Sequence, residues 1–170
     1  PSGLPSGSND VTISFWANPR VTQSASIPGV YVFGEETDYK ICGLGFSATG
    51  MYYLGYANDA AVAYAYPVGS WTRYSVTVAG ATKKVNFYAN ASLLGTEQTL
   101  AFTPNVGIVA ASLGIQRPGN LIYFDGNVQE VRVSLGVRSA DWEKLEYFTM
   151  KKTVWNGDGW LSWDAAINQV

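Results

Sequence analysis

The sequence contains no histidine, a single cysteine and few charged residues. Without histidine the chain cannot carry a Ser-His-Asp triad, a Cys-His dyad or a histidine proton shuttle, and most zinc sites are excluded. One cysteine cannot form an internal disulfide or a thiolate metal cage. Charged residues make up 14% of the chain and the formal net charge is −2, which disfavours nucleic-acid binding. The remaining classes are a carboxylate-based enzyme, a binding module and a structural module.

The chain also lacks any apolar run near the roughly 18 residues that cross a bilayer, so we expect no membrane insertion. Its 170 residues fit a single domain. Residues 1–8 are rich in Pro, Gly and Ser and are typical of a linker. The chain begins at Pro1 without an initiator Met, which favours a fragment of a multidomain protein or a processed chain. We place the domain at residues 9–150 and a C-terminal aromatic extension at residues 151–170.

The sequence is rich in short segments in which apolar and polar residues alternate, the pattern of strands that bury one face. The first segment, residues 11–16, ends at Asn18-Pro19, because proline cannot donate to a strand ladder. Turn residues follow at intervals close to the 8–12 residues of an all-β sandwich or barrel. Further strands are predicted at residues 29–34, 40–46, 50–56, 61–66, 74–78, 84–88, 92–96, 110–116, 121–124 and 128–135.

Residues 139–148 do not alternate in this way. Trp142, Leu145 and Phe148 are apolar at helical spacing, and Ser139 stands where a helix N-cap is expected. Asp141 lies in the first turn, where the positive end of the helix dipole favours an acidic residue. The pattern predicts one short helix that packs on the sandwich.

Three pieces of the chain together resemble the laminin-G-like, concanavalin A-like jelly-roll family. Residues 11–19 are similar to its opening strand, and residues 69–78 with 85–96 resemble its central hairpin. Residues 126–134 and 137–147 are similar to its closing strand and helix. The pieces occur in the family's order and at its spacing, over roughly residues 9–150.

The resemblance implies an all-β fold, an antiparallel jelly-roll β-sandwich of the concanavalin A-like type with one short C-terminal helix. One sheet would be concave and one convex, and the first and last strands would be neighbours. Two positions depart from the family pattern. Ala91 replaces the usual turn glycine, and Gln129 stands where the closing strand usually has Asp.

The first functional hypothesis is a glycoside hydrolase, since some jelly rolls of this superfamily place acids in a Glu-x-Asp-x-x-Glu run along one strand face. The nearest match begins at Glu36 and Asp38, but Ile41 occupies the third acidic position. Glu143 and Glu146 belong to the predicted helix, where we assign them to its solvated face. We therefore expect a chain that is not an enzyme, with no catalytic residues.

Calcium is the one cofactor that the resemblance leaves open, because related jelly rolls bind Ca²⁺ at the sandwich rim through Asp, Asn and backbone carbonyls. The candidate ligands are Asp10, Asp125 and Asp158. Each lies next to Gly or Asn or in an expected loop, and an ordinary turn is the favoured explanation. No EF-hand pattern is present.

Sugar binding is the third hypothesis, and it depends on tyrosines. Aromatic rings offer a flat apolar face to sugar CH groups, and the phenol hydroxyl can form hydrogen bonds. The tyrosines proposed for this role are Tyr52, Tyr56, Tyr64 and Tyr66. Polar side chains that could orient sugar hydroxyls are Asp38, Asn58, Asp59, Arg117 and Asn120. The alternative is cross-strand tyrosine packing, which stabilises sheets without any ligand.

The C-terminal extension contains Trp155, Trp160 and Trp163. We expect it to form either an extra terminal strand or an interface with another domain or a second copy of the chain. The sequence as a whole favours a non-catalytic recognition module for carbohydrate or cell-surface adhesion. Its expected partners are a surface glycoconjugate, other domains of the same protein and a homo-oligomer. The family resemblance implies an extracellular, cell-surface or virion-surface location. The alternative is a structural or assembly module of a surface or virion protein, such as a fibre, tail or decoration domain.

Overall fold

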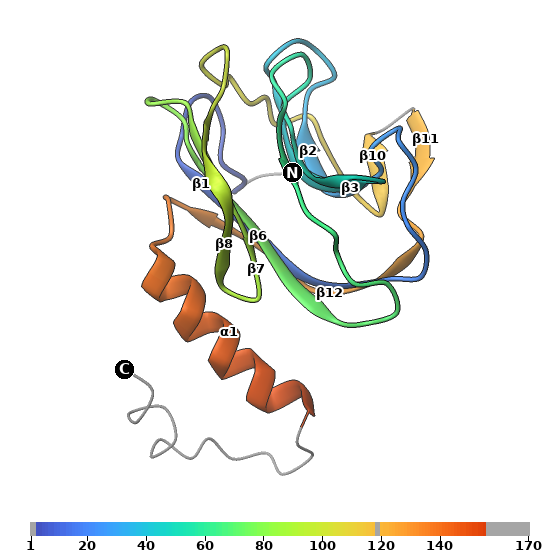
Figure 1. Cartoon of the computed structure of the whole chain (residues 1–170). Helices are drawn as coiled ribbons and strands as arrows, with labels where there is room; N and C mark the ends of the chain where they lie inside the picture. Colours follow the sequence, from blue (N-terminus) through green and yellow to red (C-terminus); the bar gives the residue numbers. More distant parts are fainter. Residues whose placement is uncertain (1–2, 118–119, 156–170) are drawn as a thin grey trace.

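The computed structural model describes residues 3–117 and 120–155, which form two antiparallel five-stranded sheets that lie face to face (Figure 1). The first sheet has the strand order β12-β1-β6-β7-β8. Its strands are β1 (Val11–Pro19), β6 (Thr72–Ala79), β7 (Lys84–Ala89), β8 (Ser92–Thr99) and β12 (Gly126–Leu135). Val11 pairs with Leu135 and Pro19 with Gly126, so the first and last strands are neighbours as expected.

The second sheet has the order β5-β4-β3-β2-β9. Its strands are β2 (Gly29–Gly34), β3 (Ile41–Ser47), β4 (Gly50–Leu54), β5 (Ala60–Ala63) and β9 (Ala110–Leu113). A separate ribbon of β10 (Ile115–Arg117) and β11 (Asn120–Tyr123) lies beside this sheet, close to β2 (Figure 1). The predicted strands are thus found with shifts at their ends, except that the single strand predicted at residues 110–116 is divided at Gly114 into β9 and β10, which belong to different sheets.

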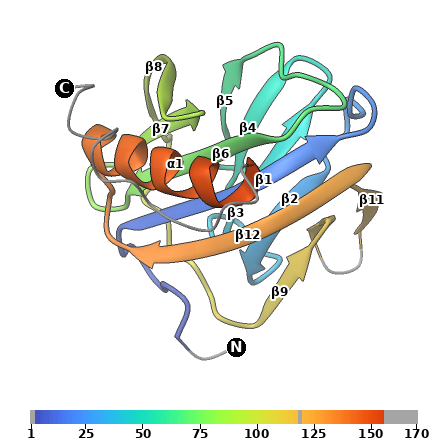
Figure 2. The ribbon, with the colours of Figure 1, turned by 90° about the horizontal axis from the view of Figure 1, so that it is seen from below.

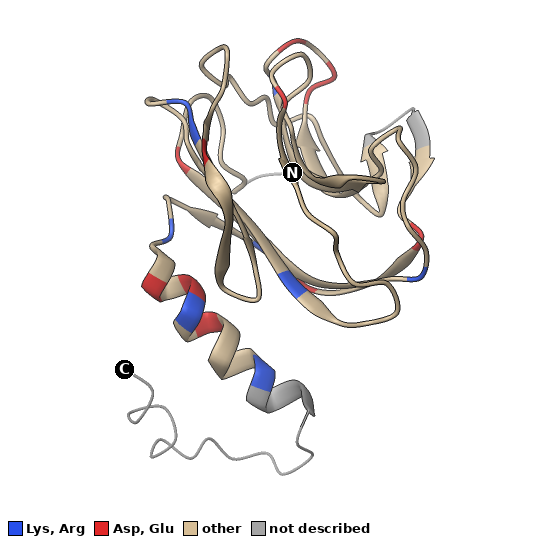
Figure 3. Cartoon of the chain, viewed as in Figure 1, with Lys and Arg blue, Asp and Glu red and all other residues tan. Residues whose placement is uncertain are grey.

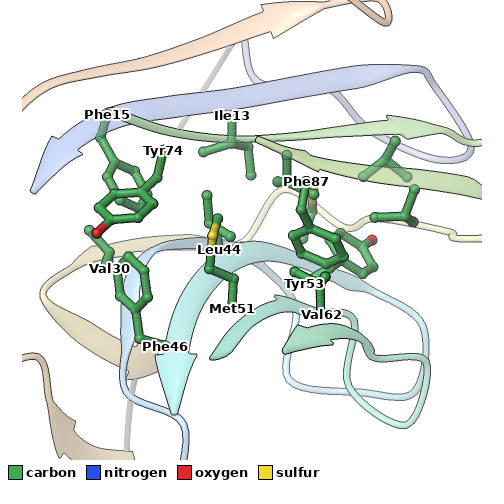
Figure 4. Packing of buried hydrophobic residues seen from close by; sticks show 14 of the residues in the cluster. Ile13, Phe15, Val30, Leu44, Phe46, Met51, Tyr53, Val62, Tyr74 and Phe87 are labelled. Atoms are coloured by element: carbon green, nitrogen blue, oxygen red, sulfur yellow. The ribbon is translucent and has the colours of Figure 1, made fainter. Parts of the chain in front are cut away.

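The core lies between the two sheets because each strand turns every second side chain inward. From the first sheet come Ile13, Phe15 and Tyr74, and from the second Leu44 and Phe46 (Figure 4). The Phe46 and Tyr74 ring centroids are 4.7 Å apart in an edge-to-face contact across the two sheets. The architecture confirms the predicted antiparallel β-sandwich.

The hairpin between β7 and β8 turns on two residues that both have left-handed backbone angles, Asn90 with φ 47° and Ala91 with φ 65°. A two-residue loop with φ positive at both positions is the turn that suits the twist of a β-hairpin. The Asn90 side chain accepts a hydrogen bond from the backbone N–H of Arg73 at 3.0 Å. Ala91 therefore holds a conformation that glycine adopts more readily.

The N-terminal segment contacts the sandwich from Leu4 onward, although residues 1–8 were predicted to be a linker. Leu4 packs against the core, and the backbones of Gly7 and Val106 exchange two hydrogen bonds of 2.8 Å. The domain therefore includes part of that segment, because a backbone bridge and an apolar contact hold it to the sheets.

The helix α1 (Ala140–Trp155) lies on the outer side of the first sheet, across β1 and β6 (Figure 2). Ser139 caps it as predicted, since its Oγ accepts a hydrogen bond from the backbone N–H of Trp142 at 3.2 Å. The helix continues past the expected end at Phe148 and reaches the C-terminal extension. No helix in the described part of the chain is long and apolar enough to cross a bilayer.

The helix packs through the opposite face from the one that we predicted. Trp142, Leu145 and Phe148 are 41%, 58% and 52% exposed, so they point away from the sheet. Glu143, assigned above to the solvated face, is fully buried. The helix is anchored instead by the stacked rings of Trp16 and Tyr147, whose centroids are 5.8 Å apart.

The physical reason for this orientation is an ion cluster under the helix. Arg73 of β6 is 1% exposed and forms ion pairs with Glu143 and Glu146, and the Ser75 hydroxyl donates to Glu143 at 2.8 Å. Arg132 of β12 also reaches Glu146 at 2.9 Å. A buried arginine is strongly unfavourable unless carboxylates form ion pairs with it. On α1, the face that carries Glu143 and Glu146 provides these carboxylates, so this face packs against the sheet.

Candidate functional site

A pocket of about 250 Å³ lies on the outer face of the second sheet, between that face, the β4–β5 loop and the β10–β11 ribbon. It is lined by Ile41, Leu54, Tyr56, Ala57, Asp59 and Gln116. The pocket and α1 are therefore on opposite outer faces of the sandwich.

The floor of the pocket is apolar. Ile41 and Leu54 lie on β3 and β4 out of phase with the core residues, so their side chains face outward. Together with Val32 they form a small buried cluster of their own, on which Ile27 and Tyr56 pack. An outward-facing apolar cluster of this kind gives the pocket an apolar floor and an aromatic wall.

The β4–β5 loop is held in a defined shape around this floor. Tyr56 and Ala57 both have left-handed backbone angles, with φ 50° and 59°. The Asp59 carboxylate accepts a hydrogen bond from the Gly55 backbone N–H at 2.7 Å, which closes the loop on itself. The Tyr56 carbonyl accepts a hydrogen bond from the backbone N–H of Tyr39 at 3.0 Å. Consecutive non-glycine residues in this region of φ are uncommon, so the backbone of this loop has a specific conformation.

Two polar side chains complete the lining. Asp59 is exposed, and the Gln116 amide donates a hydrogen bond to the Ser26 carbonyl at 2.8 Å, which fixes its position. A carboxylate and an amide beside an aromatic wall can bind a small polar ring, with its CH groups on Tyr56 and its hydroxyls on Asp59 and Gln116. The volume is smaller than the roughly 300–1,000 Å³ of drug-sized ligand pockets, so it suits a small ring.

Residues 1–142 match the family described as the concanavalin A-like lectin/glucanases superfamily. The chain belongs to this superfamily. The comparison with curated proteins finds no match.

Solved structures of the same fold include several bacterial proteins. A candidate carbohydrate-binding protein from Bacteroides ovatus is 16% identical with a TM-score of 0.65, and the match covers 85% of this chain and 42% of that one. The CBM40 domain of the Ruminococcus gnavus IT-sialidase, bound to α2,3-sialyllactose, is 15% identical with a TM-score of 0.62, covering 82% and 83%. Domain 4 of an extracellular arabinanase from Geobacillus stearothermophilus, in complex with arabinotriose, is 19% identical with a TM-score of 0.62, covering 85% and 68%.

Two of the predicted sugar-binding residues of this concanavalin A-like domain, Tyr56 and Asp59, line the pocket. Tyr52 is half-buried on the outer face of β4 but does not line it. Asp38 is exposed in the β2–β3 loop, next to the Tyr39 that contacts Tyr56. Arg117 and Asn120 are paired positions of β10 and β11, in the ribbon that supplies Gln116.

Three other predicted residues serve the fold instead of the pocket. The Tyr66 hydroxyl donates to the Ser47 carbonyl at 2.8 Å and accepts from the Gln23 backbone N–H at 2.8 Å, and burial raises its pKa. Tyr64 packs edge-on against Tyr74 at 6.4 Å, and burial raises its pKa too. Asn58 is buried and its amide binds the backbone of a neighbouring loop. Cross-strand packing, the alternative considered for the tyrosines, explains Tyr64 and Tyr66.

Sequence reasoning missed four of the lining residues, Ile41, Leu54, Ala57 and Gln116. A signal was present for the first two, because each is a large apolar residue at an outward position of its strand. Gln116 carried no such signal, since its place in the pocket depends on how the ribbon folds against the second sheet.

The candidate calcium ligands do not lie together in the described structure. Asp10 and Asp125 lie beyond opposite ends of β1, and Asp158 lies outside the described residues. The Asp10 carboxylate accepts a hydrogen bond from the Gly80 backbone N–H at 2.9 Å, and Asp125 forms an ion pair with Arg20 at 2.6 Å. Among the described residues, no three His, Cys, Asp or Glu side chains come together as a metal site. Asp10 and Asp125 therefore do not share a Ca²⁺ site.

Two further residues bear on catalysis. Glu36 and Asp38 lie in the loop between β2 and β3, so strand alternation does not place them on one sheet face as in the hydrolase pattern. Cys42 is fully buried, and burial raises the pKa of its thiol to about 12. A thiol with this pKa stays protonated near neutral pH and is not a nucleophile.

Of the predicted interface tryptophans, Trp155 lies at the end of α1, and Trp160 and Trp163 lie outside the described residues.

Proposed function

We propose that this concanavalin A-like domain is a non-catalytic carbohydrate-binding module whose ligand enters the pocket beside Tyr56. The observation that carries the proposal is the combination of an aromatic wall, an apolar floor and the polar side chains of Asp59 and Gln116 in one preformed pocket. Sugars need both kinds of surface, because each ring has apolar CH faces and hydroxyls that must be hydrogen-bonded.

Structures of the same fold support this choice of ligand class. One is seen with α2,3-sialyllactose and another with arabinotriose, so the fold accommodates sugars in both. Because the identities are only 15% and 19%, the identity of this chain's ligand has to be inferred from its own pocket.

The absence of catalysis is part of the proposal. Glycoside hydrolysis needs two carboxyl groups on opposite sides of the scissile bond, and the pocket lining contains one acidic side chain, Asp59. Superfamily membership alone does not decide the question, since its description covers lectins and glucanases alike. We infer that the module recognises a glycan outside the cell or on a particle surface, as a part of a larger protein.

A glycan array probed with the purified domain tests the proposal. We expect binding to a restricted set of glycans and no release of reducing sugar from any of them on prolonged incubation. An array without signal would refute the carbohydrate-binding function, and release of reducing sugar would refute the non-catalytic assignment.

A second candidate function, assembly with a second copy of the chain, is favoured by the exposed apolar stripe of α1. Trp142, Leu145 and Phe148 form this stripe, and a two-fold contact between antiparallel helices would set Trp142 against Phe148 of the other copy. Light scattering of the wild type and of Leu145→Glu tests it. A dimer that the substitution converts to a monomer supports assembly, and a wild-type monomer at high concentration excludes it.

A further inference from the structure

A pair of stacked aromatic rings lies on the loops next to the pocket. The ring centroids of Tyr39 and Phe102 are 4.4 Å apart and their planes meet at 29°. Phe102 is 49% exposed, although a phenylalanine side chain gains most from burial. Tyr39 belongs to the β2–β3 loop and Phe102 to the loop between β8 and β9. Their contact creates an aromatic surface that the core does not use.

Hydrogen bonds fix both residues in place. The buried Asn58 side chain accepts from the Phe102 backbone N–H at 2.9 Å and donates to the Phe102 carbonyl at 2.8 Å. The Tyr39 backbone donates to Tyr56 at 3.0 Å and accepts from Asn105 at 2.8 Å. Tyr39 also has φ 66°, a conformation that non-glycine residues adopt infrequently. The aromatic pair is therefore preorganised, as binding surfaces require.

The aromatic pair is continuous with the pocket through the β4–β5 loop. Tyr56 lines the pocket with its side chain and holds Tyr39 with its carbonyl. Asn58, which holds Phe102, lies between Ala57 and Asp59, and both of these line the pocket. One short loop thus positions both surfaces, which places them side by side at the same end of the sandwich.

The charge around these surfaces is negative. The β2–β3 loop contributes Glu35, Glu36 and Asp38, and the β4–β5 loop contributes Asp59. These four acidic residues outnumber two lysines. Lys40 is paired with Glu35 at 3.0 Å, and the Lys83 ammonium donates a hydrogen bond to the Ala101 carbonyl, next to Phe102, at 3.3 Å. Figure 3 shows acidic residues on the loops at this end of the molecule. Carboxylates accept hydrogen bonds from hydroxyls and repel anionic sugars.

We propose that the Tyr39–Phe102 pair is a second sugar subsite, and that the ligand is a neutral oligosaccharide that runs from the pocket across this pair. The inference rests on the proposed carbohydrate-binding function and specifies its ligand class. One sugar ring occupies the pocket and a following ring stacks on Phe102. The module then prefers chains over single sugars and neutral chains over sialylated or uronic ones.

Titration calorimetry with three variants tests the second subsite. The probes are neutral arabino-, xylo- and gluco-oligosaccharides of one to six units, with sialyllactose as the anionic probe. Phe102→Ala removes the platform and leaves the backbone that Asn58 holds, and Phe102→Trp restores an aromatic face. Leu93→Ala is the matched control, because Leu93 is 50% exposed in β8 of the first sheet, away from the pocket. We expect Phe102→Ala to lose about tenfold in affinity for the longer chains and nothing for the monosaccharide. Phe102→Trp and Leu93→Ala should bind as the wild type does.

The outcomes separate this inference from the proposed function. If the wild type binds a neutral chain and Phe102→Ala binds it equally well, the second subsite is refuted while the carbohydrate-binding function stands. Tighter binding of sialyllactose than of every neutral chain overturns the neutral-ligand specificity. A wild type that binds no probe on the calorimeter and no glycan on the array refutes both.

Discussion

At the scale of single residues, a buried charge determines which side of the helix meets the sheet. Arg73 has no exposed route to water, so its charge must be balanced by Glu143 and Glu146 from α1. Apolar side chains on the same helix stay exposed as a result. Burial of apolar surface is normally the dominant favourable term in folding. Leaving a buried guanidinium unpaired, however, costs more free energy than leaving three apolar side chains partly exposed.

The ion cluster predicts a large effect of Arg73→Ala on stability. Removing the arginine leaves Glu143 buried without a counter-charge, so we expect a loss of about 3–5 kcal/mol in the free energy of unfolding. Urea denaturation measures it. Arg20→Ala is the control, because Arg20 is 68% exposed in its pair with Asp125 and should cost less than about 1 kcal/mol. Equal losses in the two variants would contradict the role given to Arg73.

At the scale of elements, strand alternation and turn residues were sufficient to find the strands, and the Ser139 cap was sufficient to find the start of α1. The prediction of which helix face is buried was wrong. Trp142, Leu145 and Phe148 have the same helical spacing whether they face a sheet or solvent, so the spacing alone does not decide. The deciding residue, Arg73, lies about seventy positions away in the chain. Long-range pairing of this kind is invisible to local periodicity.

The pocket shows the same limit. Tyr56 and Asp59 were found because aromatic and acidic residues near turns are common in sugar sites. Gln116, in contrast, meets them only through the folding of the β10–β11 ribbon against the second sheet. Tyr64 and Tyr66 have the residue type of a sugar site, but their side chains turn to the core or bind backbone groups.

The β7–β8 hairpin predicts a stabilising substitution. Ala91 has φ 65°, which costs an L-residue about 1–2 kcal/mol, and glycine removes that cost while adding about 0.4–1 kcal/mol of unfolded-state entropy. We expect Ala91→Gly to raise the free energy of unfolding by about 0.5–1 kcal/mol. Ala89→Gly, two residues away in β7, should lower it, because that residue is in a strand and faces the core. Urea denaturation measures both changes. If Ala91→Gly also lowered the free energy of unfolding, the turn would be unstrained.

At the scale of the whole molecule, the sandwich separates two surfaces. The first sheet is covered by α1, and the second carries the pocket and the aromatic pair on its outer side and adjoining loops. A module built in this way can bind a glycan on one face while its helix contacts another copy or domain. The proposed recognition through aromatic and polar side chains also agrees with a composition of 14% aromatic residues.

This arrangement predicts that calcium is not needed, because Asp10 and Asp125 are engaged with Gly80 and Arg20. Adding EDTA or millimolar Ca²⁺ should leave the melting temperature and glycan binding unchanged. A bound ion at one hundred times its Kd would add about 2.7 kcal/mol, which corresponds to a rise of at least about 5 °C for a domain of this size. Differential scanning calorimetry detects such a rise, and its appearance would show that a calcium site exists.

The most direct test of the central claim compares Tyr56→Ala with Tyr52→Ala. Both residues are half-buried tyrosines in or directly after β4, but only Tyr56 lines the pocket. The measurement is the affinity of each variant, checked to be folded by near-ultraviolet circular dichroism, for the best glycan from the array. Tyr56→Ala should weaken binding by about tenfold or more, and Tyr52→Ala should match the wild type. Unchanged binding by Tyr56→Ala, or a loss confined to Tyr52→Ala, would contradict the placement of the ligand in this pocket.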